Sequence, residues 1–251
     1  MAVACTATIT TNAVTLVIAE AALETVPKEI ATHPAVAGRA RRLGARPAEM
    51  LLDRSYHHAA MKKLDGAWKR GRPDIVHFAL MEALSTPLFI EGRLQVFVHT
   101  VGDKVISMAE GLRVPKSYFR FEGVMSALFR DGAVKSDDGK VLMEMRDSTL
   151  EELAREVAPA RIVGLSSAGV QSTVQEVVAK NLAAGDWEEN VMFVVGGFPK
   201  GHFGEKTTQL FNCTYSVHPT GLEAHVVIAR LIYECEKALR LEAGVHHKRD
   251  K

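Results

Sequence analysis

Short apolar runs alternate along the chain with segments of helical periodicity. Seven runs rich in β-branched and aliphatic residues are predicted as strands. They are residues 15–19, 49–53, 94–100, 104–108, 161–166, 191–196 and 213–217. Four segments with apolar residues three and four positions apart are predicted as helices, at 75–84, 118–130, 148–157 and 221–240. This alternation predicts an α/β fold with a mainly parallel sheet.

Local signals refine this pattern in three places. The short Gly-Asp link inside residues 94–108 predicts a β-hairpin, the one expected exception to parallel pairing. Ser148, with Glu151 three positions later, has the spacing of a capping box and predicts a helix start there. The last helix is expected to present one apolar face, made by Leu222, Val226, Ala229 and Tyr233.

The length and composition are those of an ordinary globular protein. The chain has 251 residues, of which 47% are hydrophobic and 24% charged. No internal repeat or low-complexity linker divides it. We therefore expect a single domain over residues 1–245 with an elaborated first half, followed by a disordered tail at 246–251.

Cysteine usage and hydropathy bear on the compartment. Cys5, Cys213 and Cys235 are too few and too scattered for a disulfide framework or a zinc knuckle, so a reduced, cytoplasmic location is expected. No run approaches 18 uninterrupted apolar residues, and the first residues lack a cationic start, so neither a membrane span nor a signal peptide is predicted.

Charge is unevenly distributed, although the net charge is only +1. From Arg39 to Arg72 there are ten basic residues against three acidic ones. Residues 137–160 reverse this balance, with seven acidic residues and three basic. Such asymmetry is typical of a polyanion-binding face, and solvated helix faces produce the same pattern.

Several familiar catalytic patterns are absent. The ten histidines form no HExxH pair and have no CxxC partner, so no metal site is predicted. The adjacent pairs His57-His58 and His246-His247 are interpreted as surface histidines. No GxSxG elbow marks a serine nucleophile. Residues 204–207 (GEKT) end like a phosphate loop, but the acidic Glu205 would repel phosphate.

Glycine-containing loops follow three of the predicted strands. They cover residues 165–169, 196–201 and 216–222. Ligands of open α/β sheets bind beyond the carboxyl ends of the strands. With few charged side chains, these loops suit a neutral base and ribose better than a triphosphate. Tight turns that bind nothing remain the alternative interpretation.

Four motifs together resemble one known family. They are KRGRPDIVHF (69–78), LRVPKSYFRFEGVM (112–125), VGGFPKG (195–201) and YSVHPTGLEA (215–224). Their combination resembles the Nep1/Emg1 family of rRNA pseudouridine N1-methyltransferases, of the SPOUT class, over nearly the whole chain. The resemblance implies a C-terminal trefoil knot, a rare exception to unknotted topology.

The resemblance also implies S-adenosylmethionine as the cofactor and the three glycine loops as its binding site. Gly196 and Gly201 are expected to admit its close approach, and Val217 and Leu222 to form apolar walls for the adenine. The implied cofactor-binding residues are Leu165, Ser166, Gly196, Gly197, Gly201, Val217, His218, Pro219, Thr220, Gly221 and Leu222.

The implied substrate is a hairpin loop of small-subunit rRNA. Its implied contacts are Arg72, Asp74, Arg113, Lys116 and Arg120. Asp74 is expected to orient the Arg72 guanidinium, although it also suits a helix start. Lys116, where the family has arginine, and Arg120 are spaced by one helical turn. A second copy of the chain, and ribosomal proteins during small-subunit biogenesis, are the further partners implied.

The implied reaction is methyl transfer to N1 of a pseudouridine, and its catalytic group is left open. Family members often have LDSPL where this chain has LSTPL, so Ser85 stands at the aspartate position. A serine hydroxyl is a poor base without an activating partner. Either alignment with the cofactor suffices, or the chain is a non-catalytic rRNA-binding assembly factor that retains the cofactor site. An enzyme acting on another RNA is a third hypothesis.

Overall fold

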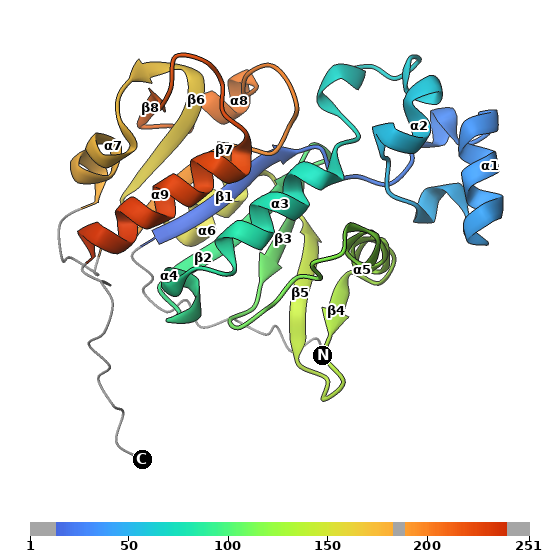
Figure 1. Ribbon diagram of the computed structural model, residues 1–251, viewed down its shortest axis with the longest axis horizontal. Coiled ribbons are helices and arrows are strands. Elements are labelled where there is room, and N and C mark those ends of the chain that lie inside the picture. Colours follow the sequence, from blue (N-terminus) through green and yellow to red (C-terminus); the bar gives the residue numbers. More distant parts are fainter. Residues whose placement is uncertain (1–13, 183–188, 240–251) are drawn as a thin grey trace.

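The computed structural model describes residues 14–182 and 189–239, and eight strands of this part form one sheet (Figure 1). The order across the sheet is β4-β5-β3-β2-β1-β7-β6-β8. The strands are β1 (Val14–Ala21), β2 (Leu94–Thr100), β3 (Lys104–Met108), β4 (Ala133–Lys135), β5 (Val141–Asp147), β6 (Arg161–Gln171), β7 (Val191–Gly196) and β8 (Cys213–Ser216).

The sheet has a parallel half and an antiparallel half. Strands β2, β1, β7, β6 and β8 pair in parallel, in that order. Strands β3, β5 and β4 extend the other edge through antiparallel pairs. The predicted mainly parallel α/β sheet and the β2–β3 hairpin are therefore confirmed. The β4 and β5 strands were not predicted, because their charged residues interrupt the apolar alternation.

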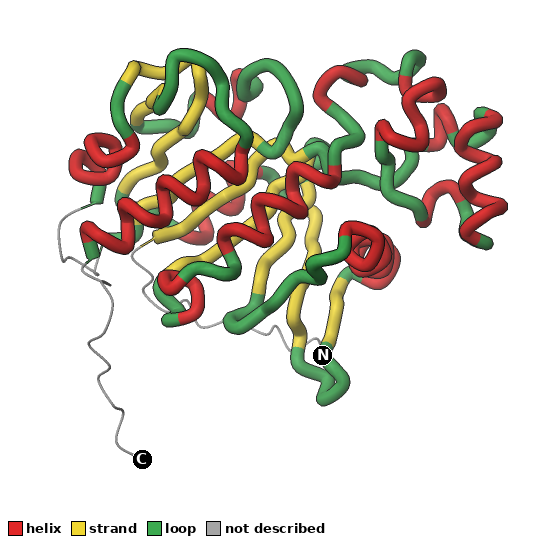
Figure 2. Tube along the Cα trace, viewed as in Figure 1, coloured by secondary structure: helices red, strands yellow, loops and turns green. Residues whose placement is uncertain are grey.

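Helices cover both faces of the sheet (Figure 2). They are α1 (Pro34–Leu43), α2 (Arg54–Met61), α3 (Pro73–Ala83), α4 (Pro87–Ile90), α5 (Tyr118–Asp131), α6 (Leu150–Val157), α7 (Val174–Asn181), α8 (Glu205–Thr208) and α9 (Ala224–Ala238). Helices α3, α5, α7 and α9 share a core with Leu16 and Ile18 of β1. Helix α6 packs on the opposite face, against Val17 and Ala19.

Residues 24–70 form a helical lobe beside the sheet, to the right in Figure 1. It contains α1, α2 and three 3-10 turns, η1 (Lys28–Ile30), η2 (Pro47–Glu49) and η3 (Ala67–Lys69). Its own small core includes Val36, Leu52 and Met61. The strand predicted at 49–53 is wrong. Met50 and Leu52 are buried in the lobe core and Leu51 in the main core, and the run forms the isolated Thr25–Leu51 bridge instead of joining the sheet.

The predicted capping box is displaced by one residue. Thr149, not Ser148, is the N-cap of α6, and its hydroxyl accepts a hydrogen bond from the Glu152 N–H at 3.2 Å. The Glu152 carboxylate accepts one from the Thr149 N–H at 2.8 Å. Helix α7 begins with the same reciprocal pair, Thr173 and Glu176, a signal that the sequence prediction did not use.

The predicted face of α9 does not point to the core. The buried face carries Val227, Ile228, Leu231, Ile232 and Cys235. Tyr233, on the predicted face, is 60% exposed, and Phe78 of the neighbouring helix α3 is 52% exposed. Helix α9 is thus apolar on two faces, and only one of them is used by the fold.

The predicted tail at 246–251 and the pair His246-His247 lie outside the described residues. The C-terminal trefoil knot stays a prediction.

His57 is buried, contrary to the surface prediction, and its Nδ1 accepts a hydrogen bond from the Asp53 N–H at 3.1 Å. Burial lowers the pKa of His57, which favours the neutral ring.

Candidate functional site

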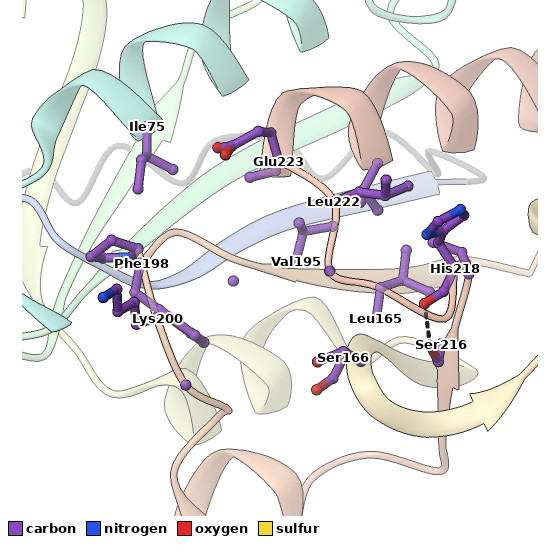
Figure 3. Close-up of a pocket in the computed structure, with 18 of the residues that line it drawn as sticks. Ile75, Leu165, Ser166, Val195, Phe198, Lys200, Ser216, His218, Leu222 and Glu223 are labelled. Atoms are coloured by element: carbon purple, nitrogen blue, oxygen red, sulfur yellow. Dashed lines mark hydrogen bonds between the residues drawn. The ribbon is translucent and has the colours of Figure 1, made fainter. Parts of the chain in front are cut away.

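A cavity of about 380 Å³ lies beyond the carboxyl ends of β7 and β8 and beside the middle of β6 (Figure 3). All three predicted glycine segments contribute to it, but residues 165–169 are not a loop: they continue strand β6, whose pairing with β8 shifts register between Leu165 and Val170. Nine of the eleven predicted cofactor residues line the cavity: Leu165, Ser166, Gly196, Gly201, Val217, His218, Thr220, Gly221 and Leu222. Its other walls were not predicted as cofactor contacts and include Arg72, Ile75, Val195, Phe198, Lys200, Ser216 and Glu223.

Gly197 and Pro219 do not line this cavity. A side chain at Gly197 would lie 2.8 Å from atoms of Ala21 and Ile18, so this glycine allows the loop to pack on the end of β1. The Gly197 N–H donates to the Ala19 carbonyl at 2.8 Å, and its carbonyl accepts from the Ala22 N–H at 2.8 Å. Gly197 therefore continues the β1–β7 pairing one residue past the end of β7.

The glycines expected to admit a cofactor make room for aromatic side chains. A Cβ at Gly196 would lie 2.8 Å from the Phe198 ring, and one at Gly201 would lie 2.5 Å from the Trp68 ring. Gly201 also has a φ of 88°, in the left-handed region that disfavours side chains. Both positions therefore require glycine, because aromatic rings of the protein lie where a Cβ would be.

Lys69 of the helical lobe and Glu20 hold the loop that follows β7, and this pair with its hydrogen bonds is called the clasp. The Lys69 ammonium donates to the Glu20 carboxylate and to the His202 carbonyl, the latter at 2.8 Å, and lies 4.0 Å from the centre of the Phe198 ring. Glu20 accepts a further bond from the Gly204 N–H at 2.7 Å. Glu20 has a φ of 48°, an unusual conformation for a non-glycine residue. The lobe is thus bonded directly to the pocket wall.

The turn after β8 is fixed by its own hydrogen bonds. The Ser216 hydroxyl donates to the His218 carbonyl at 3.0 Å, and His218 Nδ1 accepts from the Thr220 N–H at 3.2 Å. Val217 and Leu222 are partly buried against the main core. This turn therefore presents an apolar wall and backbone polar groups in an arrangement fixed by its own bonds and packing.

The pocket has two chemically different ends (Figure 3). Ser216 and His218 lie at one end, and Val195, Leu165 and Leu222 form an apolar middle. Ile75, Phe198, Lys200 and Glu223 lie at the other, where Arg72 also contributes to the lining. The end at Ser216 and His218 suits a neutral heterocycle, and the end at Lys200 and Glu223 suits a zwitterionic group.

Arg72 and Asp74 form a fixed pair at the start of α3. The Arg72 Nε and Nη2 atoms donate to the two carboxylate oxygens of Asp74 at 2.8 and 2.7 Å. The hydrogen bond to Asp74 raises the pKa of Arg72. Asp74 also lies in the first turn of α3, so both predicted roles for it are present.

Arg113, Lys116 and Arg120 are all exposed, and they flank the start of α5. The helical spacing expected for Lys116 and Arg120 is wrong, because α5 begins at Tyr118 and Lys116 precedes it. The exposed fraction of Phe119, between these cations, is 69%. The segment presents positive charge and an aromatic ring to solvent.

Buried polar contacts fasten this segment to α3 and to the lobe. His77 Nε2 lies 2.7 Å from the Pro115 carbonyl oxygen, to which it donates. The Tyr118 hydroxyl donates to the Asp53 carboxylate, the N-cap of α2. Burial and this bond raise the pKa of Tyr118, so the phenol stays protonated. The backbone segment that carries Arg113, Lys116 and Arg120 is therefore fastened to α3, the helix that begins after Arg72.

The basic run from Arg39 to Arg72 is only partly available to a partner. Six of its ten cations bond within the protein: Arg39, Arg46, Arg54, Lys69, Arg70 and Arg72. The other four, Arg41, Arg42, Lys62 and Lys63, are exposed and make no ion pair with residues in the described ranges. Much of the predicted polyanion-binding charge therefore serves the fold.

Ser85 lies away from the pocket. It follows the last turn of α3, whereas Arg72 and Ile75, which line the pocket, lie at the start of that helix. Its side chain is exposed and is not part of the lining. The geometry gives Ser85 no contact with the pocket of its own chain.

Residues 14–182 and 189–239 contain neither a metal-binding cluster nor a membrane-spanning helix. No group of three or more histidine, cysteine or acidic side chains there could hold a metal ion. No helix in these ranges has the length and hydropathy needed to cross a membrane.

Comparison with known proteins identifies the family. Residues 16–236 match the model of the EMG1/NEP1 methyltransferase family. The chain belongs to this family. The assignment made from the four motifs is thereby confirmed.

Relatives and one solved structure agree with this assignment. The chain is 41% identical over 227 residues to the ribosomal RNA small subunit methyltransferase Nep1 of Pyrobaculum calidifontis, covering 90% of this chain and 99% of the relative. Identity to the Thermococcus onnurineus Nep1 is 39% over 221 residues, with 88% and 97% covered. The Archaeoglobus fulgidus Nep1 bound to S-adenosylhomocysteine has a TM-score of 0.77 at 33% identity, covering 92% of this chain and 99% of that one.

Proposed function

We propose that this protein transfers a methyl group from S-adenosylmethionine to N1 of a pseudouridine in a hairpin loop of small-subunit rRNA. The observation that carries the proposal is the pocket itself, which joins the three glycine segments to the Arg72–Asp74 pair. Methyl transfer from this donor is the chemistry of the family to which the chain belongs. Action during small-subunit biogenesis, in the cytoplasm, is part of the same proposal.

The residues of the pocket fit the methyl donor. Leu165, Val195 and Leu222 supply flat apolar walls for an adenine, and the 216–222 turn supplies polar backbone groups for its edge. Lys200, at the opposite end, suits the carboxylate of the methionine part. A volume of about 380 Å³ is within the range of small-molecule sites.

The chain's own residues would contribute mainly by positioning. The donor supplies an electrophilic methyl group on a sulfonium. Arg72, held in one orientation by Asp74, would place the target base at the charged end of the pocket. Phe198 and Ile75 would exclude water from that end. Alignment of this kind can supply several kcal/mol of the barrier reduction, of the order of 7–11 in well-oriented systems.

The base must leave its stack to reach this pocket, which favours a single-stranded loop as substrate. The exposed Phe119 and the cations Arg113, Lys116 and Arg120 lie on the segment that His77 fastens to α3. Aromatic rings stack on unpaired bases, and cations contact the phosphates. This surface would hold the loop while one base enters the pocket.

One experiment separates an enzyme from a binding factor. Purified protein is incubated with labelled S-adenosylmethionine and a hairpin that carries pseudouridine in its loop, and in parallel with the uridine hairpin. The proposal expects label in the first RNA and none in the second. The absence of Asp at position 85 favours a non-catalytic rRNA-binding assembly factor as the second candidate, and tight binding of both ligands without transfer would support it.

Replacing Arg120 tests the RNA surface. Arg120→Ala should weaken hairpin binding and reduce the salt slope of the binding constant by about one, because one phosphate contact is lost. S-adenosylhomocysteine binding should be unchanged. Arg130→Ala is the matched control, since Arg130 lies at the other end of α5 and pairs with Asp131. An unchanged slope in Arg120→Ala would remove this residue from the proposed RNA surface.

The unused apolar face supports a homodimer. Phe78 and Tyr233 are exposed on α3 and α9, two helices that pack side by side, and the Phe78 ring lies 5.7 Å from that of His225. A second copy of the chain would cover this exposed apolar surface. Ribosomal proteins are further proposed partners, without an assigned surface.

Introducing negative charge on that face tests the dimer. The double variant Phe78→Glu, Tyr233→Glu should sediment as a monomer at micromolar concentration, while the unmodified protein sediments as a dimer. Phe119→Glu is the control, because this exposed ring lies on α5. A monomeric unmodified protein, or a dimer that survives the double change, would contradict this assignment of the interface.

A further inference from the structure

Glu223 is the only carboxylate among the residues that line the pocket in the described part of the chain. It is the N-cap residue of α9, and its side chain is exposed and directed toward Ile75 (Figure 3). It therefore lies at the charged end of the pocket, with Arg72, Phe198 and Lys200. No hydrogen bond to its carboxylate is formed by the residues that the structure describes.

Two other positions, Asp74 and Ser85, are occupied or distant from the target base. Both carboxylate oxygens of Asp74 accept hydrogen bonds from Arg72. Ser85, at the position where family members often carry aspartate, lies at the other end of α3. Glu223 also lies close enough to Arg72 for its negative charge to help raise the pKa of that guanidinium. A free acceptor thus faces the cation that is proposed to orient the base.

Resting on the proposed function, we propose that Glu223 recognises the N1–H of the target pseudouridine and accepts its proton. Pseudouridine presents N1–H at the edge where uridine presents C5–H, so an acceptor at this position distinguishes the two bases. As the nitrogen–carbon bond forms and the sulfur–carbon bond of the donor breaks, the N1 proton passes to a carboxylate oxygen of Glu223. Charge and atoms balance without another reactant.

The first test separates recognition from proton transfer. Glu223→Gln keeps an acceptor oxygen but is a far weaker base, and Glu223→Leu keeps neither property. Single-turnover methyl transfer in Glu223→Gln should fall by about 10²–10⁴-fold, the usual contribution of a general base. Its affinities for S-adenosylhomocysteine and for the uridine hairpin should stay within about threefold of the unmodified protein, because Glu223 is proposed to act only on a base that carries N1–H.

The second test is a binding measurement that needs no turnover. With S-adenosylhomocysteine bound, the unmodified protein should prefer the pseudouridine hairpin to the uridine hairpin by about fivefold or more, as expected for one hydrogen bond to a charged acceptor. Glu223→Leu should lose this preference, and Glu223→Gln should retain part of it. Equal preference in the unmodified protein and Glu223→Leu would overturn the recognition role.

Two controls separate this inference from the proposed function. Glu205→Gln removes an exposed carboxylate outside the pocket lining, and Ser85→Ala removes the hydroxyl at the family's aspartate position; both should turn over within a few-fold of the unmodified protein. Full activity in Glu223→Gln would show that the proton leaves by another route and would overturn the inference alone. An unmodified protein that methylates neither hairpin would overturn the proposed function, and the binding preference would still decide the role of Glu223.

Discussion

Gly196→Val is expected to abolish S-adenosylhomocysteine binding, lowering its affinity by at least about 10²-fold, because both the side chain and the ring that it displaces belong to the pocket. Its Cβ would lie 2.8 Å from the Phe198 ring. That ring is fixed by Lys69 at 4.0 Å and by an edge-on contact with Phe203 at 5.5 Å between ring centres. It cannot move aside without breaking those contacts and deforming the wall.

Calorimetry on the folded variant measures this effect. The φ of Gly196 is not in the left-handed region, so a side chain there adds no backbone strain of that kind. Gly221→Ala is the matched control, because Gly221 also lines the pocket but a Cβ there meets nothing within 4 Å. It should bind nearly normally. Normal affinity in a folded Gly196→Val protein would show that the ligand lies elsewhere.

Arg72→Ala should lower single-turnover methylation of the pseudouridine hairpin by about 10²-fold or more, since a misplaced base costs that much. Arg72 lines the pocket, and its guanidinium is held by two hydrogen bonds to Asp74. Arg72→Lys should be almost as slow, because an ammonium keeps the charge but loses the planar fork. Rapid-quench measurement at saturating cofactor gives the rate.

Binding measurements on the same variants identify what was lost. S-adenosylhomocysteine affinity should change little in Arg72→Ala, and Arg113→Ala, an exposed arginine outside the pocket, should keep most of the methylation rate. If cofactor affinity fell in proportion to the rate, Arg72 would instead be a cofactor contact, and its proposed role in placing the target base would be wrong.

Local periodicity was sufficient to predict the sheet elements that carry the site. The strands predicted at 94–100, 104–108 and 191–196 match β2, β3 and β7 residue for residue. These strands are apolar, short and bounded by turn residues, so burial and local propensity agree. The glycine loops after β7 and β8 were likewise predicted, because glycine and proline signals survive without tertiary information. The third loop, predicted at 165–169, is wrong, because these residues continue strand β6.

The helical lobe could not be predicted in the same way. Its elements are short, and its core is assembled from separated residues such as Val26, Ala40 and Leu64. The apolar run at 49–53 resembled a strand because an isolated pattern does not show whether a buried segment has a hydrogen-bonding neighbour. Tertiary packing, rather than local preference, determines this region.

In the charged part of the site, contacts between residues close in sequence could be predicted, and contacts between distant residues could not. Arg72 and Asp74 are two positions apart, so their pairing could be expected from the motif. The clasp joins Glu20 to Lys69 across 49 positions, and Gly204 is 184 positions from Glu20. Glu223 gave no signal in the sequence, because an acidic residue before a helix is usually explained by capping. Only the folded chain brings it to the pocket.

The most direct test of the central claim is the identity of the methylated nucleoside. The pseudouridine hairpin is incubated with protein and S-adenosylmethionine, digested to nucleosides, and analysed by chromatography with mass spectrometry against a synthetic standard. The account predicts N1-methylpseudouridine at the loop position, absent when the loop carries uridine. A methyl group on any other atom or nucleoside, or no product while both ligands bind, would contradict it.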